Sequence, residues 1–460
     1  MRDSRPAAGM DALRERRARG RRLRERVPRS RQGGWQARTD RADPVDVLQR
    51  ASVGRIPELV ALKVFRMSTS PFAFFRGAAP VMARDLATLP SSGLRTQICG
   101  DAHVKNLGAY AAPDGHLVFD LNDFDETIQG PWEWDLKRLA ASLVLAGREA
   151  GAQAASGKAA VRSFVRGYRE TLDRLSGLCM LDLIRVEIRH HLDSEALHGV
   201  LNKAERTTPL NALEKLTTRR AGGLRRFHDR PPVLYHVPAA IAKAVLASLK
   251  EYREVLGPDR QLAYDAYRAV DVAFKVVGTG SVGTRDFIVL LLGRGSDDPL
   301  LLQVKEAVAS CYAELLPDAP AYENQGRRVA EGQHRMQTAT DPLLGWTRID
   351  GRDYIVRQLS DHKAGLEPTD LTDEALPSYG AVCGEILAKA HARTGDAAAI
   401  AGYCGRGRSL DRAIAKFAVA YADQTEQDHE RLLEAIRSGR LHAASEFRLR
   451  RGWGHHRDRA

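Results

Sequence analysis

The spacing of apolar residues divides the chain into helical and strand-forming segments. Apolar positions spaced i, i+3, i+4 and i+7 over residues 134–150 and 160–175 predict amphipathic helices, and helical character continues to about residue 190. Further helices are predicted at 43–52 and 55–89, with a break at 69–77. Residues 94–99 predict a short strand, and two apolar runs around Pro113-Asp114-Gly115 predict a β-hairpin at 107–122.

Strand character dominates after about residue 266. Apolar and β-branched runs up to residue 307 predict several strands, followed by a helix at 323–338 and a strand at 352–360. Residues 376–440 again predict helices, whereas the basic segment 200–240, which contains Pro and Gly, predicts an excursion from regular structure. These segments are therefore expected to form an α+β fold.

Composition limits the class of protein. Of the 460 residues 43% are apolar, which is enough for a sizeable core in one large domain or several smaller ones. No apolar run approaches the ~18–20 residues that span a bilayer, and the Arg-rich start lacks the apolar region of a secretory signal. Five widely spaced Cys residues without a C-x-x-C pair form a poor disulfide or zinc framework, which indicates a reduced, cytoplasmic setting.

The net charge of +12 comes from the two ends of the chain. Residues 1–42 contain 14 Arg and 5 acidic residues, and residues 447–460 contain 5 Arg and 1 Asp, so the rest of the chain is nearly neutral. We therefore interpret 1–45 and 446–460 as basic, solubilising tails. Such tails can also contact nucleic acid or anionic lipid, but nothing in the sequence indicates a sequence-specific nucleic-acid reader.

Residues 278–283, with the sequence GTGSVG, are followed by a strand. A dinucleotide-binding G-x-G-x-x-G needs a helix at that place, whereas a glycine hairpin between two strands covers the ATP phosphates in protein kinases. Glycine lets the backbone approach the phosphates closely. Gly278, Gly280, Ser281 and Gly283 are therefore predicted to contact a nucleotide, and a simple tight turn is the alternative.

Lys305 follows this motif within an apolar strand, where a lysine is costly to bury unless it is paired. Its place after the glycine hairpin matches the kinase lysine that holds phosphate oxygens, and Glu331 on the following helix could pair with it. Both residues are predicted to take part in catalysis, Lys305 also by binding the nucleotide. The alternative is a lysine that extends to solvent from an edge strand.

The segment 98–106 contains Asp101, His103 and Asn106, and Asp123 follows the predicted hairpin. Asp101 and Asn106 are spaced like the Asp and Asn of the kinase catalytic loop H-R-D-L-x-x-x-N. Asp101 is therefore predicted to position or deprotonate the hydroxyl group of the acceptor. His103 is predicted to orient Asp101 or to contact phosphate. Asn106 and Asp123 are predicted to hold Mg²⁺, which prefers oxygen ligands.

Other roles are open for several of these residues. Asp101 and His103 could form a D-x-H transition-metal pair, although no further ligands with zinc-type spacing are visible. His103 could equally be structural. Asp120 and Asp125 are interpreted as ordinary turn and capping residues.

The motifs occur in an unusual order, because the catalytic-loop segment precedes the glycine hairpin by about 175 residues. They fit one site only if a kinase-like chain is circularly permuted. Residues 383–396 resemble the phosphotransferase helix that normally precedes the catalytic loop, which supports this reading. The G-D-x-H-x-x-x-N pattern, followed by Gly130-Pro131 and Asp135, is more similar to aminoglycoside phosphotransferases than to protein kinases.

Seven motifs together resemble the bacterial family called domain of unknown function 2252 (DUF2252), from about residue 20 to residue 445. They are CGDAHVKNLG, FDLNDFDETIQGPWEWDLKRLAASL, VVGTGSVGTRDFIVLL, LLQVKEA, GRRVAEGQHRMQ, YIVRQLSDHK and KAHARTGDAAAIAGYCG. The family name implies no substrate, so the kinase-like interpretation depends on the residues and on their similarity to phosphotransferases.

From these residues we expect a bilobal, protein-kinase-like α+β fold in circularly permuted order. The small antiparallel-sheet lobe is predicted at 266–365, and the mostly helical large lobe at 46–265 and 366–445. The expected function is ATP- and Mg²⁺-dependent phosphoryl transfer to an unknown, hydroxyl-bearing acceptor. Nucleotidyl transfer at the same site and non-catalytic nucleotide binding are the alternatives, and the oligomeric state is left open.

Overall fold

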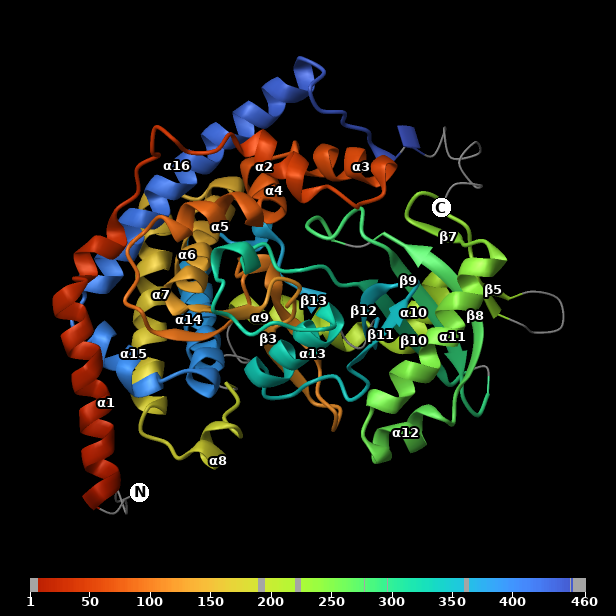
Figure 1. Cartoon of the computed structure of the whole chain (residues 1–460), viewed down its shortest axis with the longest axis horizontal. Coiled ribbons are helices and arrows are strands. Elements are labelled where there is room, and N and C mark those ends of the chain that lie inside the picture. Colours follow the sequence, from red (N-terminus) through yellow and green to blue (C-terminus); the bar gives the residue numbers. More distant parts are fainter. Residues whose placement is uncertain are drawn as a thin grey trace.

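A computed structural model describes residues 7–188, 195–219, 225–276, 278–295, 297–359, 364–446 and 448–449. The predicted α+β class is confirmed, and the paired strands of every sheet run antiparallel. Figure 1 shows the largest sheet on one side of the molecule and a layer of long helices on the other.

The largest sheet has six strands in the order β7-β8-β9-β10-β12-β11. They are β7 (Leu234–His236), β8 (Arg268–Lys275), β9 (Asp286–Leu292), β10 (Pro299–Glu306), β11 (Gly345–Ile349) and β12 (Arg352–Gln358). β10 therefore lies between two strands, with Lys305 opposite Asp286 on one side and Ile355 on the other. The helix predicted at 323–338 is α13 (Gln325–Met336), which connects β10 to β11.

Helices from before residue 266 also pack on this sheet. They are α10 (Pro209–Leu216) and α11 (Ala239–Val255), and α12 (Pro258–Tyr264) packs against α11 through Tyr264. A small pair of strands, β5 (Thr217–Arg219) and β6 (Arg225–Phe227), follows α10. Buried Leu213 shares a core with Ile288 of β9, and buried Tyr252 shares one with Val289. The strand-rich unit thus begins near residue 209, earlier than expected, because these apolar faces cover the sheet.

The helical layer is built from helices at both ends of the chain. Its long members are α6 (Trp132–Glu149), α7 (Ala154–Leu175), α14 (Ala375–Thr394) and α16 (Ser409–Arg437), as predicted. The short α15 (Ala397–Cys404) lies between α14 and α16 in the chain, and α8 (Met180–Leu183) and α9 (Glu195–Arg206) follow α7. α7 and α14 cross closely, because a Cβ on Gly384 would lie 2.1 Å from the Phe164 carbonyl oxygen. Trp132 stacks on Tyr168 inside this core, with ring centroids 5.6 Å apart.

Two small sheets carry the segment that contains Asp101. β1 (Arg95–Ile98) pairs with β4 (Ile128–Pro131), and β2 (Leu107–Ala111) lies between β3 (Leu117–Leu121) and β13 (Ala364–Gly365). The predicted strand at 94–99 and hairpin at 107–122 are confirmed. Gly115 has a φ of +88° in the hairpin turn, a conformation that glycine adopts without steric cost.

Residues 7–45 pack on the helical layer, although the sequence predicts a tail there. α1 (Ala7–Arg26) lies along α15 (Figure 1), and a Cβ on Gly20 would come within 1.9 Å of the Ala399 carbonyl oxygen. Gln32 is fully buried and donates to the Tyr403 hydroxyl at 2.9 Å. Small residues and buried polar contacts hold this segment in place. Apolar periodicity therefore gives little indication that the segment packs on the helical layer. Most of the predicted tail at 446–460 lies outside the described residues.

Four further helices lead from this segment to the Asp101 loop: α2 (Pro44–Ala51), α3 (Pro57–Met67), α4 (Pro71–Gly77) and α5 (Ala79–Ala87). The predicted break at 69–77 is therefore a helix. Ser70 caps it, since its Oγ accepts a hydrogen bond from the Ala73 backbone nitrogen at 3.0 Å, and Pro71 occupies the first turn.

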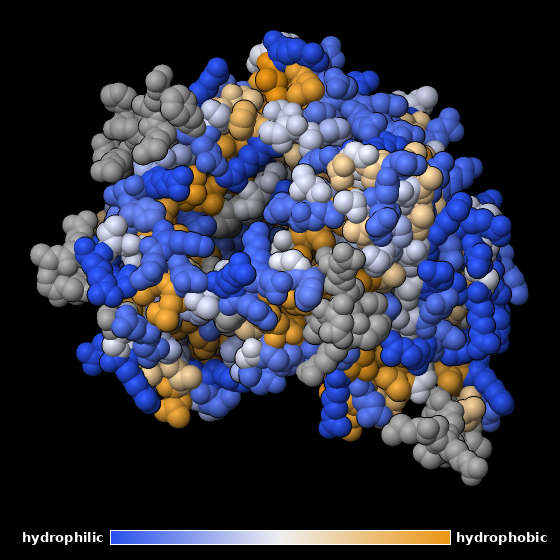
Figure 2. Space-filling view, turned by 180° about the vertical axis from the view of Figure 1, so that it is seen from behind, coloured by the Kyte–Doolittle hydropathy of each residue, from blue (hydrophilic) through white to orange (hydrophobic). Residues whose placement is uncertain are grey.

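Hydrophilic residues cover most of the visible surface. The face in Figure 2 is mainly hydrophilic, with apolar residues scattered among charged ones. Within the described ranges, no helix is both long enough and apolar enough to cross a membrane. All five cysteines are free thiols.

Candidate functional site

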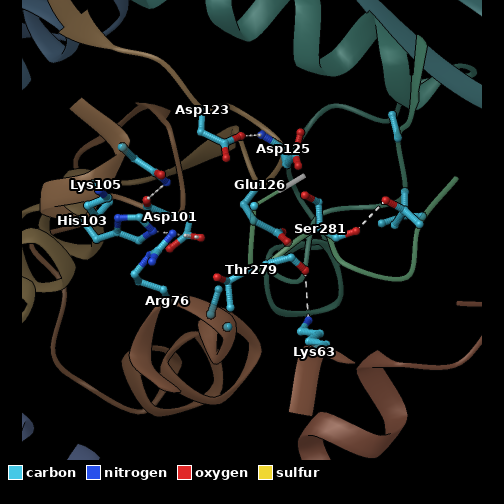
Figure 3. A pocket seen from close by; sticks show the side chains of 18 of the residues that line it. Lys63, Arg76, Asp101, His103, Lys105, Asp123, Asp125, Glu126, Thr279 and Ser281 are labelled. Carbon is cyan, nitrogen blue, oxygen red and sulfur yellow. Dashed lines mark hydrogen bonds and ion pairs between the residues drawn. The ribbon is translucent and has the colours of Figure 1, made fainter. Parts of the chain in front are cut away.

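Segments that are distant in the sequence line one cavity of about 290 Å³. It is formed by the loops at 101–106 and 122–126, the glycine hairpin between β8 and β9, the end of β10, and parts of residues 55–80. Figure 3 shows acidic and basic side chains of these segments gathered around it. The predicted site residues that line the cavity are Asp101, His103, Asn106, Asp123, Gly278, Gly280 and Ser281.

The loop that carries Asp101 is held by a buried carboxylate. Asp135, in the first turn of α6, accepts hydrogen bonds from the backbone nitrogens of Cys99 and Gly100 at 2.8 and 2.9 Å. Gly100 has a φ of +82°, and a Cβ there would lie 2.4 Å from the Glu126 carbonyl oxygen, so this position requires glycine. The helix after the Gly130-Pro131 turn therefore orients the loop.

Asp101 is paired with Arg138, whose side chain is fully buried. The guanidinium contacts Asp101 Oδ1 through Nε at 2.7 Å and Nη2 at 2.6 Å, and it lies 4.3 Å from the centre of the Phe75 ring. Asn106 Nδ2 donates to the Asp101 backbone carbonyl at 2.7 Å, so the amide oxygen of Asn106 remains available to a cation. With Oδ1 occupied, Oδ2 is the oxygen of Asp101 that can receive a proton.

His103 is an uncharged neighbour of this pair. It is 3% exposed, and burial lowers its pKa to about 3, although Asp101 opposes this shift. Its Nε2 lies 3.9 Å from Asp101 Oδ2, and its ring packs edge-on against Phe72 at 6.4 Å. A neutral imidazole carries no charge to attract phosphate. Of the two predicted roles of His103, orienting Asp101 is therefore favoured over contacting phosphate.

Acidification from about pH 6.5 to pH 3 is expected to destabilise the parent protein more steeply than the variant His103→Gln. In this window the unfolded histidine binds a proton that the buried imidazole, with its pKa of about 3, does not bind. The slopes should differ by up to about 1.4 kcal/mol per pH unit. Urea unfolding at several pH values measures them, with His198→Gln at an exposed position of α9 as the control. Parallel slopes for the parent and His103→Gln would contradict a neutral His103.

Lys305 pairs with Asp125, which lies 180 positions earlier in the chain. Burial alone would lower the pKa of Lys305, but the charges of Asp125 and Asp123 raise it. Burial likewise would raise the pKa of Asp125, but Lys305 lowers it below its ordinary value. The pKa of Asp123 is raised by burial and by the charge of Asp125. The two acids therefore compete for positive charge. Asp125 lines the cavity, and Lys305 lies directly behind it as its partner.

The predicted partner of Lys305, Glu331, lies elsewhere. On α13 it pairs with Arg327 at 2.7 Å and with Arg335 at 2.8 Å, one turn away on either side. The predicted Lys305–Glu331 pair is therefore corrected to Lys305–Asp125. Asp125, interpreted from the sequence as a turn residue, is the acid that compensates the buried lysine.

The glycine hairpin joins β8 to β9, as predicted, and basic side chains anchor it. Lys63 Nζ and Arg55 Nη1 both donate to the Gly280 carbonyl oxygen at 3.0 Å. Gly278 and Gly283 have φ values of +64° and +96°, which favour glycine. Gly283 faces the Arg55 side chain and is not among the described residues that line the cavity.

Sequence reasoning missed several charged residues of this site, and the signal was present for one of them. Lys63 is 5% exposed within the apolar helix sequence LVALKVF, the same kind of environment that identified Lys305. Burial lowers its pKa to about 7. Arg76 and Arg357 also line the cavity, without any comparable pattern around them. Asp120, interpreted as a turn residue, forms a buried ion pair with Lys389 of α14.

Asn106 and Asp123 suit a hard divalent cation. Both line the cavity with oxygen ligands, and a cation would relieve the unfavourable charge between Asp123 and Asp125. The described part of the chain contains no group of three or more His, Cys, Asp or Glu side chains arranged around a metal. Further ligands would therefore have to come from water or from phosphate oxygens, as is usual for Mg²⁺. The D-x-H transition-metal alternative likewise finds no additional ligands among these residues.

The site thus belongs to an α+β protein with a charged cavity between its sheet and its helical layer. The family model described as "Uncharacterized protein conserved in bacteria (DUF2252)" matches residues 55–435. The chain belongs to this family, as its motifs indicate, and the match spans all cavity-lining segments. No curated protein and no solved structure matched the chain.

Proposed function

We propose that this protein is an ATP- and Mg²⁺-dependent phosphotransferase with a kinase-like site. One observation carries the proposal: Lys305, on a central strand, pairs with Asp125 at a cavity that Asp101, Asn106 and Asp123 also line. Kinases combine the same parts, namely a glycine hairpin, a strand lysine, a catalytic Asp, and an Asn and an Asp that hold Mg²⁺. These residues come from segments separated by about 200 positions in the sequence, so a shared cavity is unexpected unless they act together.

The order of elements supports a circularly permuted, bilobal kinase-like fold. The glycine hairpin joins β8 and β9, Lys305 lies on the next strand, β10, and α13 follows, in the kinase order. The loop with Asp101 precedes this unit instead of following it. α14, which resembles the helix before the catalytic loop, comes near the end of the chain. A change in where the chain begins accounts for both displacements.

Lys305 departs from the kinase pattern in its partner. Active protein kinases pair this lysine with a glutamate of the following helix, whereas Glu331 is engaged by two arginines. In the proposed cycle the Lys305–Asp125 pair is a resting arrangement. Bound phosphates would then compete with Asp125 for the ammonium group.

In the proposed reaction the acceptor oxygen bonds to the γ-phosphorus of ATP, the bond to the bridging oxygen breaks, and ADP leaves. Asp101 Oδ2 takes the hydroxyl proton, while Arg138 holds Oδ1 and fixes the carboxylate. Lys305 supplies positive charge at the phosphate end of the cavity. Asn106 and Asp123 would hold Mg²⁺, which neutralises phosphate charge when it is bound.

The first test is whether ATP binding depends on the proposed metal ligand. We expect ATP with Mg²⁺ to raise the melting temperature of the parent more than ATP alone, and Asp123→Asn to lose most of that difference. An affinity for ATP about tenfold weaker is expected, because the Mg²⁺ ion that would hold the phosphates loses a charged ligand. Asp259→Asn, at an exposed acid of α12, is the matched control. Equal shifts for the parent and Asp123→Asn would refute the metal assignment, and no shift with any nucleotide would refute the function.

Product mass separates the two alternatives that use the same cavity. Phosphoryl transfer adds about 80 Da to an acceptor, whereas adenylyl transfer adds about 329 Da. A screen of hydroxyl compounds with labelled ATP supplies the products. Tight Mg²⁺·ATP binding without any transfer to such compounds would instead favour a nucleotide-binding protein that is not an enzyme.

A further inference from the structure

Arg76, at the end of α4, lines the cavity and finds no direct partner among the described residues. Among the described residues, none forms a hydrogen bond or an ion pair with its guanidinium, and its Nε is buried. Burial lowers its pKa, and the charges of Asp101, Glu367, Glu149 and Asp123 oppose this without outweighing it. A guanidinium has five donors, so a half-buried one that meets no acceptor is poorly compensated. An anion bound in the cavity would supply the acceptor that the Arg76 guanidinium lacks.

The nearest charged neighbours of Arg76 are engaged with other partners. Figure 3 shows it beside Asp101 and His103. Asp101 is already neutralised by Arg138, and His103 is uncharged because burial lowers its pKa to about 3. Lys105, which also lines this end of the cavity, has its own partner, Glu367, at 2.7 Å. One positive charge therefore remains next to the carboxylate that would receive the acceptor hydroxyl.

We propose that the acceptor is itself an anion, whose phosphate or carboxylate group binds Arg76 while its hydroxyl faces Asp101. This inference rests on the proposed phosphotransferase function and narrows its substrate class. The guanidinium fork matches both oxyanions with two parallel hydrogen bonds, which would fix the acceptor in one orientation. Orientation of the attacking oxygen is a large part of catalysis in phosphoryl transfer.

The other basic residues of the cavity are already engaged. Lys63 and Arg55 donate to the Gly280 carbonyl oxygen, and Arg357 donates to Gln303 at 2.9 Å. Lys63 and Arg55 contact the glycine hairpin, and Arg357 lies on β12. In the proposed function this side of the cavity would hold the ATP phosphates. Arg76 comes instead from α4, next to the Asp101 loop. The rival explanation is that Arg76 binds the γ-phosphate of ATP, and the experiment separates the two.

The test titrates inorganic phosphate into protein saturated with a non-hydrolysable ATP analogue and Mg²⁺, by calorimetry. The parent should bind phosphate in this state. Arg76→Gln should bind it at least about tenfold more weakly, because a charge-assisted hydrogen bond is lost, and Arg76→Lys should fall between the two. Arg84→Gln, on α5 and outside the cavity lining, should match the parent. Glycerol 3-phosphate should bind like phosphate, and glycerol should not.

A structural role for Arg76 predicts a different pattern. If Arg76 only supports the fold, Arg76→Gln lowers the melting temperature of the ligand-free protein, whereas removal of an uncompensated cation leaves it unchanged or raises it. The proposal is overturned if phosphate does not bind, if Arg76→Gln binds it as tightly as the parent, or if the ATP analogue displaces it. Acetate titrated in place of phosphate shows whether the site also accepts a carboxylate.

The failure of this inference is distinguishable from failure of the proposed function. If the ATP analogue does not bind, the phosphotransferase proposal falls, and the substrate claim falls with it. Phosphate titrated into the nucleotide-free parent and Arg76→Gln then still decides whether Arg76 forms an anion site. The converse outcome is that the nucleotide binds with Mg²⁺ while phosphate does not bind beside it. That result leaves the proposed phosphotransferase function standing and refutes the proposal that the acceptor is an anion.

Discussion

Replacing Lys305 by methionine is expected to abolish stabilisation by ATP and to lower phosphoryl transfer at least about 100-fold, because the main positive charge at the phosphate end is lost. The fold itself should survive. Lys305 is 2% exposed on an apolar strand, where a methionine of similar length packs well. Its partner Asp125 is 35% exposed on its side chain, so water can solvate the carboxylate that remains. Thermal shift with ATP and Mg²⁺, and turnover of labelled ATP, measure the effect.

Two variants make this experiment specific. Lys275→Met changes a lysine of the same sheet that lies outside the cavity lining, and it should keep the response to ATP. Lys305→Met combined with Asp125→Asn removes the remaining carboxylate and should restore stability without restoring transfer. Full ATP stabilisation in Lys305→Met would show that the pair is structural, and would remove the strand lysine from the proposed mechanism.

Elements with a strong local pattern could be predicted from the sequence. The hairpin around Gly115 has a turn signal between two apolar runs, and the strand at 286–292 is nearly all apolar. The glycine hairpin is recognisable because a strand, not a helix, follows it. In each case the deciding interactions lie within a few residues of one another, which is the range that a sequence pattern reports.

The choice of partners depends on tertiary distances and could not be predicted in the same way. Several acids of the sequence could pair with Lys305, and the analogy with kinases favours Glu331. One local signal argued against it: Arg327 and Arg335 stand four residues to either side of Glu331, a spacing at which helix side chains pair. Asp125 gave no such signal, because its contact with β10 forms only when the two parts of the fold meet.

The boundaries between units also depend on tertiary packing. Apolar periodicity does not say which core covers a helix face, and Tyr252 of α11 packs against the sheet. The N-terminal segment was interpreted as a tail because charged residues dominate it. Its contacts use Gly20, Gln32 and Arg41, none of which contributes to an apolar stripe.

Replacing Arg41 by methionine is expected to destabilise the fold by about 3–5 kcal/mol, the cost of leaving buried charges without their partner. Arg41 contacts Asp85 at 2.8 Å and Asp428 at 2.6 Å, and these side chains are 7% and 3% exposed. Burial already raises the pKa of Asp85 against the opposing effect of Arg41. Urea unfolding of the parent and the variant measures the loss. Deletion of residues 1–42 removes the same arginine and should be at least as harmful, in contrast to a free tail.

Arg38→Met provides the matched control, because Arg38 lies three residues away and pairs with Asp40 on the surface. It should leave the unfolding midpoint nearly unchanged.

Adding Asp85→Asn and Asp428→Asn to Arg41→Met should recover part of the stability, since no charge is then left unpaired. Burial raises the pKa of Asp85, and loss of Arg41 removes the charge that opposes this, so stability falls as the pH rises through the pKa of Asp85 in the folded variant. The deficit of Arg41→Met relative to the parent should therefore be larger at pH 8 than at pH 5, and an equal deficit at both pH values would show that the arginine acts through packing alone.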